Sequence, residues 1–296
     1  MRSITCINNV TGVTAEFRED GFTPFFLAAV DGIYQSENNV FVSDNTMTDG
    51  STYQGSIAKQ RNIVLHIMDN PQSPDFVYNQ QNRDFLYGLF RKGEQGTLIY
   101  TENGKSRKIE YHPEKIERAP SGSRLFSISL ICENPMFRDE NDHRVSIANW
   151  IDDFEFLHEF IDDGEEFAHR SDVRLVNIVN DVATNGIGLT ITITATGPVK
   201  NPVITHVETE DHLQIGSGEM SLYLERGDVV TITTSLNNKH VRLTSENITQ
   251  EINQYLTEDS EFIQLMFGNN DIAYDAEEGA EFMVVDIKYA YEYEGA

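Results

Sequence analysis

The most constraining feature of this sequence is a strict two-residue alternation over residues 189–196. Leu189, Ile191, Ile193 and Ala195 alternate with threonines. Successive side chains of a strand point to opposite faces of a sheet, so this pattern predicts a strand with one buried and one solvated face. Further short apolar segments follow at residues 220–224, 230–232, 241–243, 262–266, 272–274 and 283–293. Because short strands at this spacing are typical of a β-sandwich, we expect one in the second half.

The last of these segments ends in a row of tyrosines. Met283, Val285 and Ile287 are followed at the same spacing by Tyr289, Tyr291 and Tyr293. We expect all six to share one face of a single final strand. Earlier in this half, Arg226-Gly227-Asp228 matches an integrin-binding tripeptide, but its position between two strand segments favours a β-turn.

The first half mixes strand segments with one helix. Strands are expected at residues 4–7, 25–30, 61–68, 97–101, 107–111 and 125–132. Asn103-Gly104 supplies the two positive φ angles of a type I′ turn, so the two segments around it form a predicted hairpin. Residues 43–56 are polar and contain Asp49-Gly50, which indicates a long loop or an arm.

The helix is expected over residues 79–92. Its apolar stripe at helical spacing consists of Phe85, Leu86, Leu89 and Phe90. Gly93 stands where a helix C-terminus favours glycine, and the basic Arg91 and Lys92 suit the last turn.

Length and charge divide the chain in two. A chain of 296 residues exceeds what one core ordinarily supports, so we expect two domains. The composition changes after residues 133–135, which places an N-terminal domain at residues 1–136 and an acidic connector with the sandwich at residues 137–296. The first segment holds 13 Lys and Arg against 16 Asp and Glu, whereas the second holds 9 against 32. Nearly all of the net charge of −26 therefore belongs to the second half.

Charge and hydropathy argue against several classes of partner. A chain this acidic lacks the clusters of Lys and Arg on which nucleic-acid and anionic-membrane binding depend. No apolar stretch is long enough for a signal peptide or a membrane span, so we expect assembly in a cytoplasm. Cys6 and Cys132 stand in strand-like segments and are expected to be buried free thiols, not a disulfide framework.

The residues nearest to a metal site in pattern lie in the acidic connector. His158 and His169 stand beside Glu159 and Glu166, but this spacing matches no common zinc pattern and no cysteine is near. The connector also lacks the ordered acids of a calcium loop. The chain has no Gly-rich phosphate loop, no nucleophile elbow and no His-Glu-x-x-His motif. We therefore expect no enzyme and no cofactor, and we assign no catalytic, cofactor-binding or metal-ligating residue.

Carbohydrate binding is the main alternative that the residues leave open. The chain holds 12 tyrosines, and its one tryptophan, Trp150, lies in the connector. The alternative is a carbohydrate-binding adhesin acting through the C-terminal β-sandwich. A glycoside hydrolase is less favoured, because 48 acidic residues offer many pairs whose separations a sequence does not show.

Several motifs run in the order found in one known family. In the second half these are Asn201-Pro202, Leu-Tyr-Leu-Glu-Arg-Gly-Asp at 222–228, Ser260-x-Phe262-x-x-Leu265-x-x-Gly268-x-Asn270-x-Ile272-x-Tyr274, Val285-x-Ile287-x-Tyr289, and Tyr293-Glu294-Gly295. In the first half they are Asp49-Gly50, Tyr53, Arg61, the helix around Phe85–Phe90, and residues 127–135. On these motifs the chain resembles the distal tail proteins (Dit) of siphophages and related prophage tails. It departs from the pattern at residues 243–247 and in its heavier acidic connector.

The resemblance implies a structural protein of the virion tail tip. Dit proteins have an N-terminal β-domain with one helix and an extended arm, which closes six copies into a ring, and an outer galectin-like β-sandwich. The implied partners are other copies of the chain, a tail tube protein, a hub or lysin protein of the baseplate and a receptor-binding protein. No specific nucleic acid and no membrane insertion are implied. Because like charges repel at close contact, we expect the nearly neutral residues 1–136 to close the ring, with the arm within Thr14–Ser56.

Overall fold

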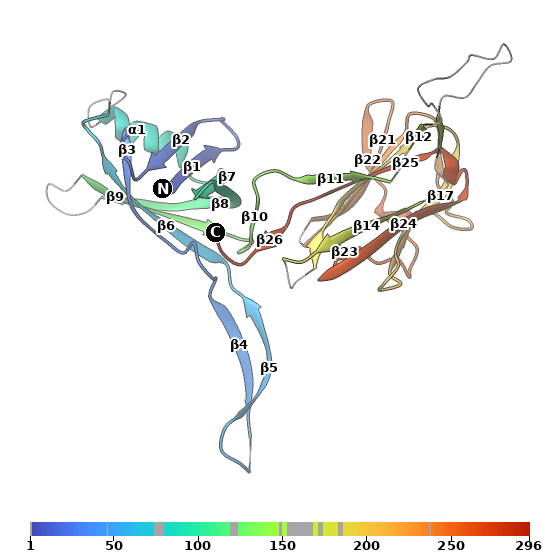
Figure 1. The fold of residues 1–296 in the computed structure, drawn as a ribbon, viewed down its shortest axis with the longest axis horizontal. Helices are drawn as coiled ribbons and strands as arrows, with labels where there is room; N and C mark the ends of the chain where they lie inside the picture. The colour runs from blue at the N-terminus through green and yellow to red at the C-terminus, as the bar shows by residue number, and fades with distance from the viewer. Residues whose placement is uncertain are drawn as a thin grey trace. The chain divides into compact units, whose positions relative to one another are not determined.

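The chain divides into two compact units, both built mainly from strands (Figure 1). The computed structural model describes residues 2–45, 47–73, 80–118, 124–147, 150–152, 168–170, 174–182, 186–236 and 238–296. Unit 1 comprises Met1–Glu140 and Glu292–Ala296, and unit 2 comprises Asn141–Tyr291. Within the described ranges there is one α-helix, so the mainly β fold predicted from the sequence is confirmed.

Unit 1 is built on a closed β-barrel. Its strands are β1 (Arg2–Asn8), β2 (Thr14–Arg18), β3 (Phe25–Asp31), β6 (Arg61–Asp69), β7 (Gly96–Glu102), β8 (Lys105–Arg118) and β9 (Leu125–Cys132). They are ordered β8-β7-β1-β2-β3-β6-β9, and β9 pairs again with β8, which closes the sheet. The turn between β7 and β8 has φ angles of 53° at Asn103 and 79° at Gly104, so the predicted hairpin is confirmed.

Alternation along the strands supplies the barrel core. On β6, Ile63, Leu65 and Ile67 are each 0 % exposed, while the residues between them are more accessible. The two cysteines come from β1 and β9 and are buried free thiols, as predicted. The core of unit 1 is therefore formed by apolar side chains from strands that are far apart in the sequence.

The helix α1 (Gln80–Leu89) packs Leu86 and Leu89 into this core, each 1 % exposed. It is shorter than the predicted span, and Arg91 and Lys92 lie beyond its last turn. The chain leaves the helix through a turn at Gly93, whose φ is +82°. The prediction that these two basic residues belong to the last helical turn is therefore wrong.

A separate hairpin forms the arm. The strands β4 (Asn38–Asp44) and β5 (Ser51–Ala58) form a two-stranded sheet of their own, with a register shift between Phe41 and Val42. Figure 1 shows this hairpin projecting from the body of unit 1, away from α1. The polar segment 43–56 is therefore an arm, and its second half is strand, not loop.

The C-terminal segment returns to unit 1. The strand β25 (Met283–Tyr289) belongs to unit 2, whereas β26 (Glu292–Tyr293) pairs with β10 (Phe137–Asp139), which in turn pairs with β8. Phe137 is 0 % exposed and anchors β10 in the barrel core. The predicted single final strand reaching residue 293 is therefore wrong, because its last residues join a different sheet.

Unit 2 is a β-sandwich in which two sheets enclose one core. The first sheet has the order β11 (His143–Ser146), β25, β16 (Thr190–Ala195), β20 (Val229–Ser235), β21 (Asn238–Ser245) and β22 (Ile248–Glu251). The second has the order β14 (Leu175–Asn180), β24 (Gly268–Glu278), β17 (Val199–His206) and β18 (His212–Gln214), with β19 (Tyr223–Leu224) also paired to β17. Small elements complete it: β12 (Trp150–Asp152), β13 (Ala168–Arg170), β15 (Ile187–Gly188), β23 (Gln264–Leu265), η1 (Asn253–Tyr255) and η2 (Ala280–Phe282).

The alternating segment at residues 189–196 contains β16, which lies at the centre of the first sheet. Its Ile191 and Ile193 are 1 % and 0 % exposed and belong to the sandwich core. The strands predicted at 220–224 and 262–266 are shorter than expected, because only β19 and β23, of two residues each, form there. The galectin-like topology of this sandwich stays a prediction.

Candidate interaction surfaces

Within the described ranges, no group of three or more His, Cys, Asp or Glu side chains could hold a metal ion. The connector residues His158, Glu159 and Glu166 lie outside the described residues, and only the backbone of His169, in β13, is described. No helix in the described part of the chain is long and apolar enough to cross a membrane. The most distinctive surfaces in the structure belong to unit 1.

The arm exposes apolar side chains on both of its faces. Paired residues of a hairpin share a face, so Val42 and Tyr53 lie on one side, while Phe41, opposite Gly55, lies on the other. The exposed fractions along the arm are 59 % for Val40, 46 % for Phe41, 53 % for Val42, 63 % for Tyr53 and 64 % for Ile57. An isolated two-stranded hairpin is at best marginally stable in water. This combination is typical of a segment that a partner covers.

The charge of the arm is confined to its tip. Between residues 38 and 58 the only charged side chains are Asp44 and Asp49. Both are exposed, as is Met47 between them, which is 94 % exposed. The tip, which we define as residues 44, 45 and 47–51, is therefore both acidic and apolar.

A groove of about 540 Å³ lies between the end of α1 and β8, and we call it the α1 groove. Its lining consists of Tyr87, Phe90, Arg91, Lys92, Glu94, Pro113, Glu114, Lys115 and Ile116. The lining combines aromatic and aliphatic side chains with three cations and two carboxylates. It is the larger of the two cavities described in unit 1.

The charged groups of the α1 groove differ in how far they are already paired. Arg91 contacts Glu94 at 3.2 Å, and Lys115 contacts Glu117 at 3.2 Å. Glu94 also accepts a hydrogen bond of 2.8 Å from Asn8 Nδ2. Lys92 makes no ion pair with any described residue and is exposed. Among the residues that the structure describes, no carboxylate pairs with Lys92, so this cation can meet an external carboxylate.

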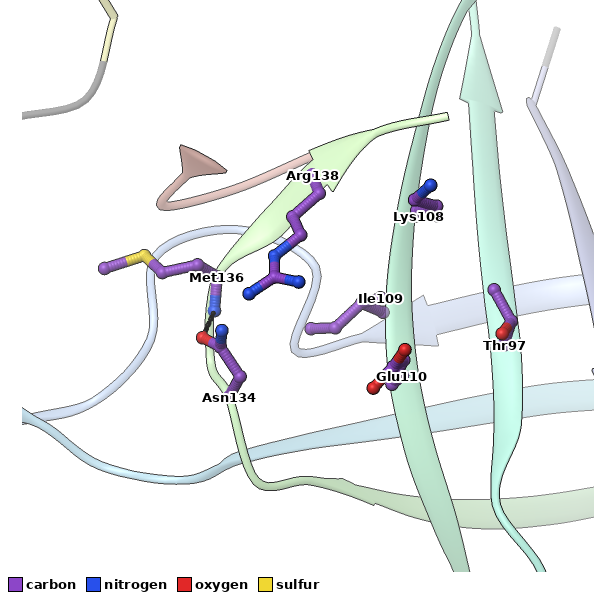
Figure 2. Close-up of a pocket in the computed structure, with 7 residues that line it drawn as sticks. All are labelled: Thr97, Lys108, Ile109, Glu110, Asn134, Met136 and Arg138. Carbon is purple, nitrogen blue, oxygen red and sulfur yellow. Dashed lines mark hydrogen bonds between the residues drawn. The ribbon is translucent and has the colours of Figure 1, made fainter. Parts of the chain in front are cut away.

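A smaller cavity of about 170 Å³ lies beside the pairing of β8 with β10 (Figure 2). Two cations line it, but both are engaged: Arg138 Nε donates to Glu292 Oε1 at 3.0 Å, and Lys108 Nζ donates to the Glu140 carbonyl at 3.0 Å. The Asn134 side chain accepts the backbone N–H of Met136 at 3.0 Å. These contacts brace β10 and β26, so we read this cavity as a packing gap.

Arg61 ties the C-terminal segment into unit 1. It is 2 % exposed, and its guanidinium carbon lies 5.0 Å from the centre of the Phe137 ring. The guanidinium donates to four backbone carbonyls, those of Pro135, Gly32, Tyr34 and Glu294. Burial lowers the pKa of this group. Arg107 acts in the same way, since it stacks 3.7 Å from the Tyr293 ring centre and donates to the Gly295 carbonyl.

The outer surface of unit 2 carries exposed ion pairs. On its first sheet, Arg144 contacts Asp286 at 2.8 Å and Arg242 contacts Glu251 at 2.6 Å. The tripeptide at 226–228 forms the expected β-turn, with φ of +100° at Gly227 and Asp228 Oδ2 accepting the Glu225 N–H at 2.9 Å. Unit 2 also exposes apolar side chains, among them Tyr223, Leu236 and Ile248, so its surface differs from the arm chiefly in its charge.

Sequence reasoning missed the apolar character of the arm and the burial of Arg61. The run Val40-Phe41-Val42 was an available signal, because three consecutive apolar residues between polar segments are unusual in a loop. Arg61 was noted only as part of the family pattern, and its neighbours in the sequence do not predict that it is buried. The α1 groove combines residues of α1 with residues of β8, and only the fold brings them together.

Comparison with known proteins adds a family and a fold. Residues 183–293 match the model of the family described as siphovirus-type tail component, C-terminal domain. The structure is similar to the crystal structure of the Dit protein of phage SPP1, with a TM-score of 0.63 at 10 % identity over 98 % of this chain and 99 % of that one. It is also similar to a chain of the phage P2 baseplate in its activated conformation, with a TM-score of 0.55 at 10 % identity over the full length of both. No curated protein sequence matches the chain.

The family match assigns residues 183–293 to the C-terminal domain of siphovirus-type tail components, and the whole chain shares the fold of the SPP1 Dit protein. More particularly, the matched C-terminal segment and the fold of the whole chain support the resemblance to Dit proteins seen in the sequence motifs.

Proposed function

We propose that this chain is the distal tail protein of a phage or prophage tail, and that six copies form a ring through unit 1. The ring joins the tail tube to the hub protein at the tail tip. Unit 2 serves as the docking site for the receptor-binding apparatus. The protein acts by assembly at the tip of the virion, after folding in the host cytoplasm, and not by catalysis.

The observation that carries this proposal is the exposed apolar arm on the less charged unit. Unit 1 holds 14 Lys and Arg against 20 Asp and Glu, a net charge of −6, whereas unit 2 holds 8 against 28, a net charge of −20. Close packing of copies brings like charges together, and this costs less in unit 1. The arm supplies the apolar area that such packing needs.

The partners follow from the same division. The tail tube protein and the hub or lysin protein are expected on the ring formed by unit 1, because a ring offers two faces. Receptor-binding proteins are expected on unit 2, whose surface carries most of the charge. Charged surfaces favour selective docking and fast association more than they favour tight self-packing.

Negative-stain electron microscopy and native mass spectrometry of the full chain test the proposal. We expect sixfold rings and a mass of six copies of the 33.6 kDa chain. A monomer at micromolar concentration would contradict the ring. A monomer that also binds cell-wall glycans would support the carbohydrate-binding adhesin instead.

A further inference from the structure

We propose that the arm tip of one copy docks in the α1 groove of the next copy. This inference rests on the proposed ring and goes further by naming both sides of the contact. The arm tip is residues 44, 45 and 47–51, and the α1 groove lies between the end of α1 and β8.

The arm tip has the composition that the groove requires. Met47 is 94 % exposed and is flanked by Asp44 and Asp49. Methionine is unbranched and adapts its shape to irregular apolar surfaces. The tip therefore presents one flexible apolar anchor between two carboxylates, with no cation in the arm to neutralise them.

The α1 groove offers the complementary surface. Tyr87, which is 56 % exposed, lines it together with Phe90 and Ile116 and presents an apolar surface at which Met47 can be buried. Lys92 makes no ion pair with any described residue, so it is available to an acidic tip residue. Pairing the arm with this groove would match both an apolar contact and an opposite charge.

The positions of tip and groove in unit 1 require that the contact be made between copies. Figure 1 shows the hairpin projecting from the body of unit 1 away from α1, and strands of this length span about 25 Å. A copy that gives its arm to one neighbour and receives an arm from another makes a heterologous interface. Such head-to-tail interfaces generate closed rings when the rotation between copies closes.

Cysteine cross-linking of the full chain tests the contact. The double variant M47C/K92C carries one new thiol in the tip and one at the groove, while Cys6 and Cys132 are each 0 % exposed. After mild oxidation, or with a short bismaleimide, we expect a ladder of covalent multimers ending at the ring. The matched control M47C/K105C also replaces an exposed lysine, but at the far end of β8 from Pro113, and it should yield no ladder.

The outcomes separate this inference from the proposed function. Rings without a ladder in M47C/K92C would overturn the arm-to-groove contact and leave the ring in place, with the groove assigned to a tail partner. A ladder that is equally strong in M47C/K105C would also overturn it. Absence of rings from the unmodified chain would overturn the proposed function itself.

A charge exchange gives a second readout that does not depend on cross-linking. Lys92→Glu should weaken each contact about two- to fivefold, the range of exposed ion pairs, and should lower the ring fraction at a fixed concentration. Asp49→Lys should do the same, and the two changes together should restore rings. If the double exchange is no better than either single variant, Lys92 and Asp49 do not meet.

Discussion

The two units of this chain are both built mainly from strands, but they differ in net charge and in the arrangement of their exposed residues. Unit 1 is a closed barrel with a net charge of −6, an apolar arm and a buried arginine that holds the end of the chain. Unit 2 is a sandwich with a net charge of −20, exposed ion pairs and scattered exposed apolar side chains. Both units expose apolar side chains, but in unit 1 a set of them is gathered on the arm, whereas most of the negative charge lies in unit 2. Self-association needs a gathered apolar surface, and selective docking tolerates charge.

Among the changes considered, removal of the arm from unit 1 should have the largest effect, and the effect should be on self-association. A variant in which residues 39–57 are replaced by Gly-Gly should lose its rings, with self-association about 100-fold weaker or more per contact, because burial of a large apolar side chain contributes about 1.5–3 kcal/mol. Native mass spectrometry would show the monomer. The matched control is Ile248→Ser in unit 2, which also removes an exposed apolar residue, 70 % accessible, from a hairpin strand. If this control abolishes rings and the arm deletion does not, the roles of the units are reversed.

Replacement of Arg61 should destabilise unit 1 and leave the stability of unit 2 unchanged. Arg61→Met leaves four backbone carbonyls without their charged donor, and we expect unit 1 to lose about 3–5 kcal/mol. Calorimetry should show one transition moving down while the other stays. Arg242→Met, which breaks an exposed pair on unit 2, should leave both transitions nearly unchanged. A loss shared equally by both transitions would mean that the units unfold together.

The elements that the sequence predicted well are those with a strong local period. The alternation at β16 and the apolar runs of β1, β3, β6 and β9 identify strands because burial follows the pleat. The Asn103-Gly104 turn was predictable for the same reason, since its φ angles are a local property.

The element boundaries that the sequence predicted wrongly share a different cause. The helix α1 ends directly before the buried Phe90, and β25 ends before the chain passes to β26, which pairs with β10. Both depend on contacts between distant segments, and single-sequence patterns do not contain them. The interaction surfaces were the least predictable part of the molecule. The burial of Arg61 and the lining of the α1 groove arise only when distant segments come together in the fold.

Alkaline pH should weaken unit 1 more than unit 2. Burial raises the pKa of Cys132 to about 12 from the usual 9.0, and it raises the pKa of Cys6 as well. A thiol whose folded pKa is raised gives stability that is complete below the unfolded pKa and is lost as pH rises toward the folded pKa. We therefore expect unit 1 to lose stability between about pH 9 and pH 12, by about 1.4 kcal/mol per pH unit for each thiol. Unit 2 contains no cysteine, and the pKa of its partly exposed Tyr289, which burial raises to about 12 from 10.0, gives a smaller loss that begins only above about pH 10.

Thiol labelling measures this effect directly. At pH 8 the thiolate fraction of Cys132 should be about 1,000-fold lower than that of an ordinary thiol, so a disulfide reagent should react only when unit 1 opens. The labelling rate should rise in Arg61→Met and stay unchanged in Arg242→Met. Rapid labelling of the native chain would show that the barrel core is open to solvent.

Salt should have the smallest effect on stability, and it should favour unit 2 over unit 1. Raising the ionic strength from 0.05 to 0.5 M shortens the Debye length from roughly 14 Å to 4 Å and screens the self-repulsion of unit 2. Its net charge of −20 should then raise its melting temperature by a few degrees, by the order of 2–4 °C for about 1 kcal/mol in a unit of this size. Unit 1, with its net charge of −6, should move less. The distinction needs a salt of weakly interacting ions, because sulfate would stabilise both units by exclusion from the surface. Equal shifts in sodium chloride would mean that local ion pairs, such as Arg144 with Asp286, already offset the repulsion within unit 2.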